Sequence, residues 1–167
     1  MTLLKIFRPD YAFEQVTDLT TQKLQELGLT NLLLDVDCTL KSYRSSEVSP
    51  EVRKWLDELK KNGTGLCIIS NGRGRRISAF AESLGIPFVA PAMKPSARGC
   101  LKAMKTHGFD PEKTAMVGDQ IFADIWAGHR AKIRDILITP IRPEEEPWFA
   151  QIKRPFEKFI LWLHGKR

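Results

Sequence analysis

The sequence has few cysteines, and none of them has a paired spacing. The three cysteines are Cys38, Cys67 and Cys100, and no two of them form a Cys-x-x-Cys unit. An odd number without such spacing argues against a disulfide framework and against a structural zinc site. We therefore expect a protein of a reducing compartment.

Long apolar runs are also missing. No segment approaches the roughly 20 apolar residues that a membrane-spanning helix needs. The apolar start of the chain is short and interrupted by Lys5, unlike a secretory signal peptide. The 167 residues suffice for one domain, and they contain no internal repeat. We expect a cytoplasmic protein, either soluble or peripheral on the inner face of the membrane.

Positive charge exceeds negative charge. The chain has 26 Lys and Arg residues against 20 Asp and Glu residues, a formal net charge of +6. This balance favours an anionic partner, such as a phosphorylated substrate, a nucleic acid or an acidic membrane surface. A basic protein without a special partner is the alternative.

Apolar runs and helix signals alternate along most of the chain. The expected strands are 32–34, 65–70, 86–90, 114–117 and 134–139, and the expected helices between them are 51–61, 75–84, 96–107 and 121–131. This alternation predicts an α/β fold with a five-stranded parallel sheet and helices on both faces. We assign residues 1–150 to one catalytic domain, with its core at about 30–140, and residues 151–167 to a basic amphipathic C-terminal helix.

Polar residues follow four of the expected strands. They are Asp35 and Asp37, Ser70 and Asn71, Lys94, and Asp119 with Asp124. In an open parallel sheet, strand ends of this kind converge on one cleft. Because buried carboxylates are costly without a partner, we expect a hard cation with oxygen ligands, namely Mg²⁺.

This set has the ingredients of phosphoryl transfer through an aspartyl phosphate. Such a reaction needs a carboxylate nucleophile, an acid for the leaving oxygen, and cations that neutralise the phosphoryl oxygens. Asp35 would be the nucleophile and Asp37 the acid. Asp119 would hold Mg²⁺ with Asp35, while Ser70 and Lys94 would bind the phosphoryl group.

The order of these motifs resembles the haloacid dehalogenase (HAD) superfamily of aspartate-dependent phosphatases. Asp35-Val36-Asp37-Cys38-Thr39 is similar to its DxDxT nucleophile motif, and Gly118-Asp119 with Asp124 is similar to its acidic fourth motif. Ser70 and Lys94 match the second and third motifs. An aspartate two positions after the nucleophile marks the phosphatases of this superfamily, so the resemblance implies hydrolysis on a Rossmann-like three-layer sandwich.

The whole chain resembles the YqeG family, subfamily IIIA, which includes the phosphatidylglycerophosphate phosphatases of mitochondria and plastids. The matching segments are Arg8-Pro9-Asp10, Ser70-Asn71, Leu84-Gly85-Ile86-Pro87, Lys94-Pro95, Gly118-Asp119-Gln120 and Gly128-His129-Arg130. Members often carry asparagine at the positions of Cys38 and Gly72, and neither position is catalytic.

The resemblance implies a role for each matched residue. The catalytic residues are Asp35, Asp37 and Lys94. The residues that bind the substrate phosphate are Thr39, Ser70, Asn71 and Lys94, and Thr39 also orders its loop. The metal ligands are Asp35, Asp37 through its backbone carbonyl, and Asp119, with Asp124 in support.

The sequence leaves no room for a lid domain. Only a short loop separates Asp37 from the helix that starts near Pro50, and one helix and one strand fill the interval from Ser70 to Lys94. An open cleft favours a large substrate or one presented on a surface. In 153–167, Phe156, Phe159, Ile160 and Leu163 recur at helical spacing among basic residues. This pattern fits peripheral membrane contact, or equally a helix packed on the core.

Three functional hypotheses follow. The first is a Mg²⁺-dependent phosphatase of an anionic lipid, phosphatidylglycerophosphate. The second has the same chemistry with a phosphoprotein, a nucleic-acid end or a soluble ester as substrate. The third is a non-catalytic domain, either a phosphoacceptor or an RNA binder. We expect no nucleic-acid partner, because no aromatic-and-glycine RNA motif is present. The oligomeric state stays open.

Overall fold

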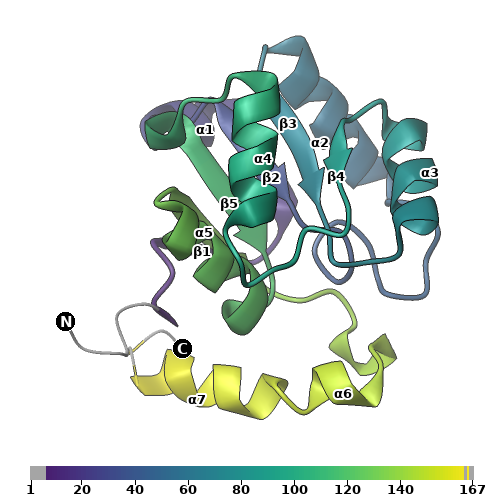
Figure 1. The fold of residues 1–167 in the computed structure, drawn as a ribbon, viewed down its shortest axis with the longest axis vertical. Helices are drawn as coiled ribbons and strands as arrows, with labels where there is room; N and C mark the ends of the chain where they lie inside the picture. The colour runs from purple at the N-terminus through teal and green to yellow at the C-terminus, as the bar shows by residue number, and fades with distance from the viewer. Residues whose placement is uncertain (1–6, 164, 166–167) are drawn as a thin grey trace.

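A six-stranded parallel sheet forms the centre of the molecule (Figure 1). The computed structural model describes residues 7–163 and residue 165. The strands lie in the order β1-β6-β5-β2-β3-β4, and each neighbouring pair is parallel. Their bounds are β1 Tyr11–Phe13, β2 Asn31–Leu34, β3 Gly65–Ile69, β4 Phe88–Val89, β5 Thr114–Gly118 and β6 Arg134–Ile138.

The prediction of five strands was short by one. The additional strand is β1, which pairs with the edge strand β6 from Tyr11 opposite Ile136 to Phe13 opposite Ile138. Three residues are too few to show an alternating pattern, and its side chains are only partly buried or exposed. The pairing partner, rather than a strand signal of its own, therefore makes this segment extended.

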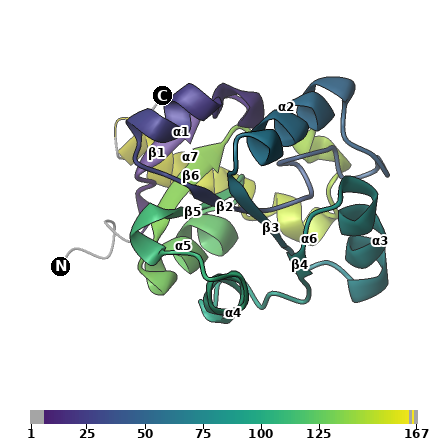
Figure 2. The same ribbon diagram turned by 90° about the horizontal axis from the view of Figure 1, so that it is seen from above.

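Helices cover both faces of the sheet, as the alternating pattern predicts (Figure 2). One face carries α1 (Thr21–Glu26), α2 (Pro50–Lys61) and α3 (Gly74–Leu84), and the other carries α4 (Arg98–His107) and α5 (Trp126–Ala131). Successive side chains of a strand point to opposite faces. Leu32 and Leu34 accordingly pack against α1, α2 and α3, whereas Leu33 packs against α4 and α5. Burial of these apolar side chains is the main stabilising contribution.

Local signals set the ends of the helices. The Ser49 side chain accepts a hydrogen bond from the Val52 N–H, and Pro50 occupies the first helical position, as predicted for α2.

The segment after β5 begins differently from the expected regular helix. Ile121–Ile125 forms a π-helical turn before α5. Such wide turns occur often at functional sites, and this one carries Asp124.

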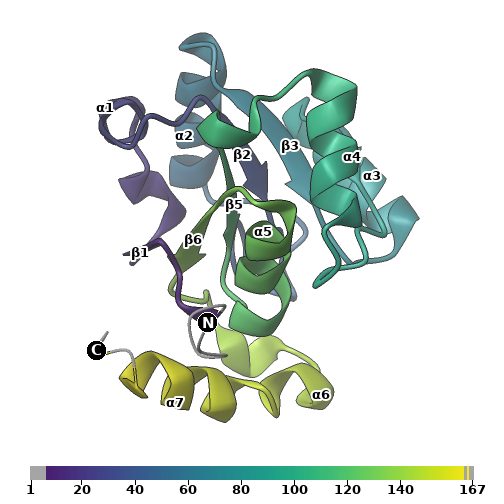
Figure 3. The same cartoon turned by 60° about the vertical axis from the view of Figure 1, so that its left-hand side comes forward.

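The C-terminal segment lies across the end of the sheet at which β2, β3 and β5 finish (Figures 1 and 3). It contains α6 (Trp148–Gln151) and α7 (Arg154–Leu163). The C-terminal helix was predicted over 151–167, whereas α7 begins at Arg154. His164, Lys166, Arg167 and the side chain of Leu163 lie outside the described residues. Among the residues described, none of the helices has the length and apolar character needed to cross a bilayer.

Candidate active site

Lys94 joins the ends of two strands in a buried ion-pair network. Its Nζ donates to Oδ1 of Asp35 at 2.5 Å and to Oδ1 of Asp124 at 2.6 Å. Asp35 directly follows β2, and Asp124 lies in the π-helical turn after β5. Burial alone would lower the pKa of Lys94, but the two carboxylates outweigh burial and raise it. Lys94 is therefore a fixed positive charge at this edge of the sheet.

Three carboxylates meet beside this lysine. One oxygen from each of Asp35, Asp119 and Asp124 lies within 4.8 Å of the others, and all three residues are buried. Burial raises the pKa of Asp35 to about 8 and that of Asp119 to about 7, and the neighbouring carboxylates add to both shifts. The cluster therefore holds more negative charge than its surroundings favour.

The loop after β2 turns sharply to bring Thr39 under this cluster. The Thr39 hydroxyl donates to Oδ1 of Asp119 at 2.7 Å. Cys38 makes the turn with a φ of 63°, in the left-handed region that asparagine tolerates better than most residues. A hydroxyl has a single hydrogen to donate. This contact thus suits the predicted role of ordering the loop better than the predicted role of binding phosphate.

Asp37 lies at the rim of the site, between two cations. Arg76 donates to Oδ1 at 2.9 Å and to Oδ2 at 2.5 Å, and Lys41 donates to Oδ1 at 2.9 Å. Burial would raise the pKa of Asp37, but the hydrogen bonds from Arg76 and Lys41 outweigh it and hold the pKa below its usual range. Asp37 is therefore an ionised carboxylate in this arrangement.

The two residues after β3 shape the neighbouring loop. Ser70 is buried, and its Oγ accepts a hydrogen bond from the Gly72 N–H at 3.1 Å. The Asn71 side chain makes two hydrogen bonds to the backbone of Lys94. Its Nδ2 donates to the Lys94 carbonyl, and its Oδ1 accepts from the Lys94 N–H, each at 2.8 Å. The structure thus gives Asn71 a clear part in positioning Lys94.

Arg154 is a residue of this site that sequence reasoning missed. From α7, it donates to the Asp119 carbonyl at 3.0 Å and to Asp119 Oδ2 at 2.5 Å. It also donates to Oε2 of Glu146, at 2.9 Å from Nε and 2.7 Å from Nη2. Arg154 lies in a basic run, so its sequence context indicated a solvated charge. The only available signal was the shortage of cations among the predicted site residues.

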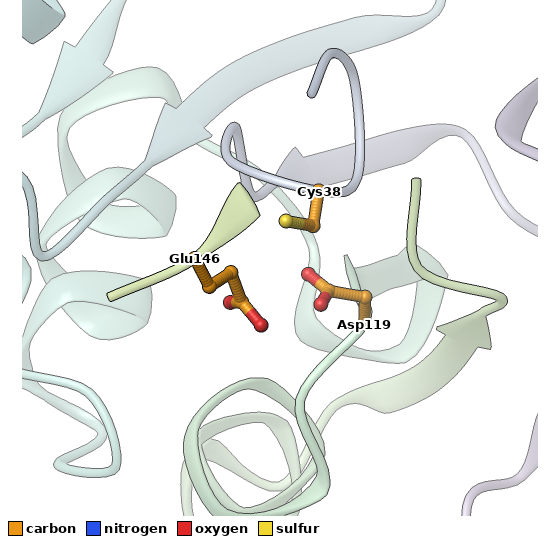
Figure 4. Close-up of side chains that lie close together, drawn as sticks. All are labelled: Cys38, Asp119 and Glu146. Atoms are coloured by element: carbon orange, nitrogen blue, oxygen red, sulfur yellow. The ribbon is translucent and has the colours of Figure 1, made fainter. Parts of the chain in front are cut away.

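Cys38, Asp119 and Glu146 form a second close group (Figure 4). Their ligand atoms lie within 4.8 Å of one another, and all three residues are buried. Arg154 already neutralises both carboxylates of this group. Burial, together with the nearby Asp119 and Glu146 charges, raises the pKa of the Cys38 thiol. Thiolate sulfur suits soft metal ions rather than a hard cation such as Mg²⁺, so this group is better described as an ion-pair network than as a site for that cation.

Gly118 leaves the space that Asp124 occupies. A Cβ at position 118 would overlap the side chain of Asp124. We expect Gly118→Ala to destabilise the fold by about 1–3 kcal/mol and, because Asp124 and Lys94 move, to lower the phosphatase activity predicted from the sequence about 100-fold. Urea unfolding and phosphate release measure the two effects.

Gly74→Ala is the matched control, because a Cβ added at position 74 would have nothing within 4 Å of it. That change should leave activity intact and alter stability by no more than about 1 kcal/mol. If Gly118→Ala behaves like Gly74→Ala, the position of Asp124 is not important for activity.

Comparison with known proteins agrees with this geometry. The chain belongs to the haloacid dehalogenase-like hydrolases, whose family model matches residues 4–132. A Bacillus subtilis protein named "Probable phosphatase YqeG" is 30% identical over 95% of this chain and 92% of its own length. The enzyme is thus a hydrolase of this family, with relatives named as phosphatases.

Two more distant matches add detail. The chloroplastic phosphatidylglycerophosphate phosphatase 1 of Chlamydomonas reinhardtii is 26% identical over 90% of this chain, which spans 60% of that protein. A cobalt-bound deoxy-D-mannose-octulosonate 8-phosphate phosphatase from Haemophilus influenzae has a TM-score of 0.55 at 17% identity. That alignment covers 87% of this chain and 93% of the other, and it supports the fold alone.

The site suits the divalent cation that phosphatases of this family use. Three buried carboxylates, of Asp35, Asp119 and Asp124, provide a concentrated set of oxygen ligands, and burial raises the pKa of Asp35 and Asp119. Hard cations prefer such ligands. Asp35 and Asp119 could hold the cation, and Asp124 lies close enough to contribute an oxygen. A bound cation would neutralise the carboxylates and the phosphoryl oxygens of a substrate.

Proposed function

We propose that this chain is a Mg²⁺-dependent phosphomonoesterase that forms an aspartyl phosphate on Asp35 and hydrolyses phosphatidylglycerophosphate. The observation that supports the chemistry best is the contact of one buried lysine with Asp35 and Asp124 at the edge of the sheet. A nucleophile beside a fixed cation is suited to attack on an anionic phosphoryl group. The lipid substrate is supported by the name of the Chlamydomonas relative.

Asp35 would begin the reaction. One of its oxygens attacks phosphorus, and the bond from phosphorus to the ester oxygen breaks. The leaving oxygen takes a proton from Asp37. In the second step, Asp37 accepts a proton from water, and the water oxygen attacks phosphorus. Phosphate then leaves, and the Asp35 carboxylate is restored.

Asp37 must carry a proton in the first step, although its pKa is lowered here by Arg76 and Lys41. The phosphoryl group of a substrate is a competing acceptor for Arg76, which is partly exposed. When Arg76 turns to the substrate, the pKa of Asp37 rises and the residue becomes a better proton donor. Substrate binding would thereby prepare the acid that the first step needs.

Ser70, Asn71 and Lys94 would hold the phosphoryl group. The Ser70 hydroxyl accepts from the backbone of Gly72, and its own hydrogen can turn toward a phosphoryl oxygen. Lys94 would neutralise charge as phosphorus is attacked. Asp119, with Asp35 and the carbonyl of Asp37, is the proposed set of Mg²⁺ ligands.

The test is phosphate release from vesicles that contain phosphatidylglycerophosphate, with and without Mg²⁺. We expect release that requires Mg²⁺ and exceeds the rate on soluble phosphate esters at equal phosphate concentration. Release from soluble esters, phosphopeptides or phosphorylated nucleic-acid ends, but not from vesicles, would keep the chemistry and overturn the lipid assignment. Asp35→Asn serves as the inactive control in each assay. A lipid substrate also implies a peripheral membrane location, with contact through residues 153–167.

A further inference from the structure

The outer face of α6 and α7 carries a concentration of exposed apolar side chains. We define the outer apolar face as Trp148, Ile152, Phe156, Phe159 and Trp162, each between 54% and 73% exposed. These five residues are more than half of the nine large hydrophobic residues that are exposed among the described residues. Monomeric soluble proteins rarely gather so many in one short segment.

The opposite side of α7 makes the contacts that attach the helix to the domain. Glu157 is buried and accepts a hydrogen bond from the Phe122 N–H at 3.1 Å. Ile160 and Leu161 are partly buried against the cluster that contains Ile121 and Leu137. Packing on the core therefore accounts for the inner residues of α7 but not for the exposed side chains of Phe156, Phe159 and Trp162.

We infer that the outer apolar face of α6 and α7 is the surface by which this protein docks on an anionic lipid bilayer. The exposed Lys153 and Lys158 accompany the apolar residues, and the chain has a net charge of +6. Basic helices with aromatic residues on one face bind at the boundary between headgroups and acyl chains. Tryptophan favours that boundary, and Trp148 and Trp162 lie toward the two ends of the face.

The charge distribution favours a bilayer over a second copy of this chain. In a symmetric dimer built on this face, the same patch of both copies would meet, and the interface would gather Lys153 and Lys158 of both copies. An anionic bilayer instead offers an apolar layer for the rings and negative headgroups for the lysines.

This docking surface lies directly beside the proposed active site. Arg154 of α7 contacts Asp119, while Phe156 and Phe159 of the same helix are exposed. A cavity of about 810 Å³ lies along the inner side of α7, with Asp119, Arg154 and Leu161 in its wall. A headgroup phosphate at the bilayer surface would then be about one helix diameter, roughly 10 Å, from the carboxylates. This part of the inference rests on the proposed lipid phosphatase function.

Vesicle binding tests the docking surface without any catalysis. The full chain is sedimented with vesicles of phosphatidylcholine alone or with phosphatidylglycerol added, a lipid without a phosphomonoester. We expect binding to the anionic vesicles that falls at least about tenfold in the triple variant Phe156→Ala, Phe159→Ala and Trp162→Ala, because the apolar area that leaves water is lost. Hydrolysis of a soluble phosphate ester should be unchanged, which also shows that the variant is folded.

The matched control is the pair Phe88→Ala and Leu101→Ala, which removes exposed apolar side chains from β4 and α4. It should bind vesicles as the unmodified chain does. Absence of binding by the unmodified chain, or equal loss in both variants, would overturn the inference. A dimer that the triple variant dissociates would assign the face to a second copy instead. Vesicle binding without lipid hydrolysis would retain the docking surface and reject only the proposed substrate.

Discussion

Replacing Asp35 with asparagine lowers phosphate release at least about 1,000-fold, because the amide cannot act as the nucleophile that the proposed mechanism requires. The position of Asp35 makes this a clean experiment. The residue is buried beside Lys94 at the end of β2, and asparagine has nearly the same shape. Steady-state kinetics on the best ester substrate measure the effect. Residual activity above about one tenth would contradict a nucleophilic role.

The Asp35→Asn change that removes activity should not lower the stability of the metal-free protein at pH 8. Burial raises the pKa of Asp35 from 3.8 to about 8. The folded state therefore binds more protons than the unfolded state between these values, and this group lowers stability as the pH rises from about 4 to about 8. Asparagine does not ionise, so the metal-free variant should unfold at the same or a higher temperature at pH 8. Calorimetry at pH 5 and pH 8 separates lost chemistry from lost folding.

Replacing Lys94 with methionine destabilises the metal-free fold by about 3–5 kcal/mol, because two buried carboxylates lose their shared cation. Lys94 contacts both Asp35 and Asp124 and is almost fully buried. Activity should fall about 100- to 1,000-fold, since a fixed positive charge beside the reacting group disappears. The two measurements are urea unfolding at pH 9, above the raised pKa of Asp35, and phosphate release.

Two conditions distinguish this electrostatic effect from general damage. The destabilisation should be smaller at pH 5 than at pH 9, because the pKa of Asp35 is raised to about 8 even beside Lys94, so that this carboxyl is protonated at the lower pH and ionised beside Lys94 at the higher pH. Added Mg²⁺ should restore part of the stability. Lys102→Met on the exposed side of α4 is the matched control and should have little effect. A loss below about 1 kcal/mol for Lys94→Met, or one that does not depend on pH, would refute the role of Lys94 as a shared counter-ion.

The sequence was sufficient to predict the centre of the molecule and the residues that gather there. An apolar run followed by Asp35 marks the end of β2, and Gly118-Asp119 marks the end of β5, because parallel strands finish at the same edge. The strand β1 escaped prediction because it is short and depends on β6 for its hydrogen bonds. The π-helical turn at Asp124 escaped because local propensities favoured an ordinary helix.

The environment of these residues was harder to foresee, since it depends on segments that return from far along the chain. Arg154 meets Asp119 only because α7 crosses the end of the sheet. Spacing also failed to show which side of α7 packs on the domain. Phe156, Phe159 and Ile160 all belonged to the apolar face expected from sequence, but the structure exposes the two phenylalanines and partly buries Ile160.

The most direct test of the proposed chemistry is to trap the phosphorylated enzyme. Enzyme and a hydrolysed ester are mixed with Mg²⁺, quenched in acid within one turnover, and digested for mass spectrometry. We predict one phosphoryl group on the peptide that contains Asp35, lost when turnover continues and absent in Asp35→Asn. Rapid hydrolysis with no phosphorylated peptide, or with the phosphoryl group on another residue, would contradict nucleophilic catalysis by Asp35.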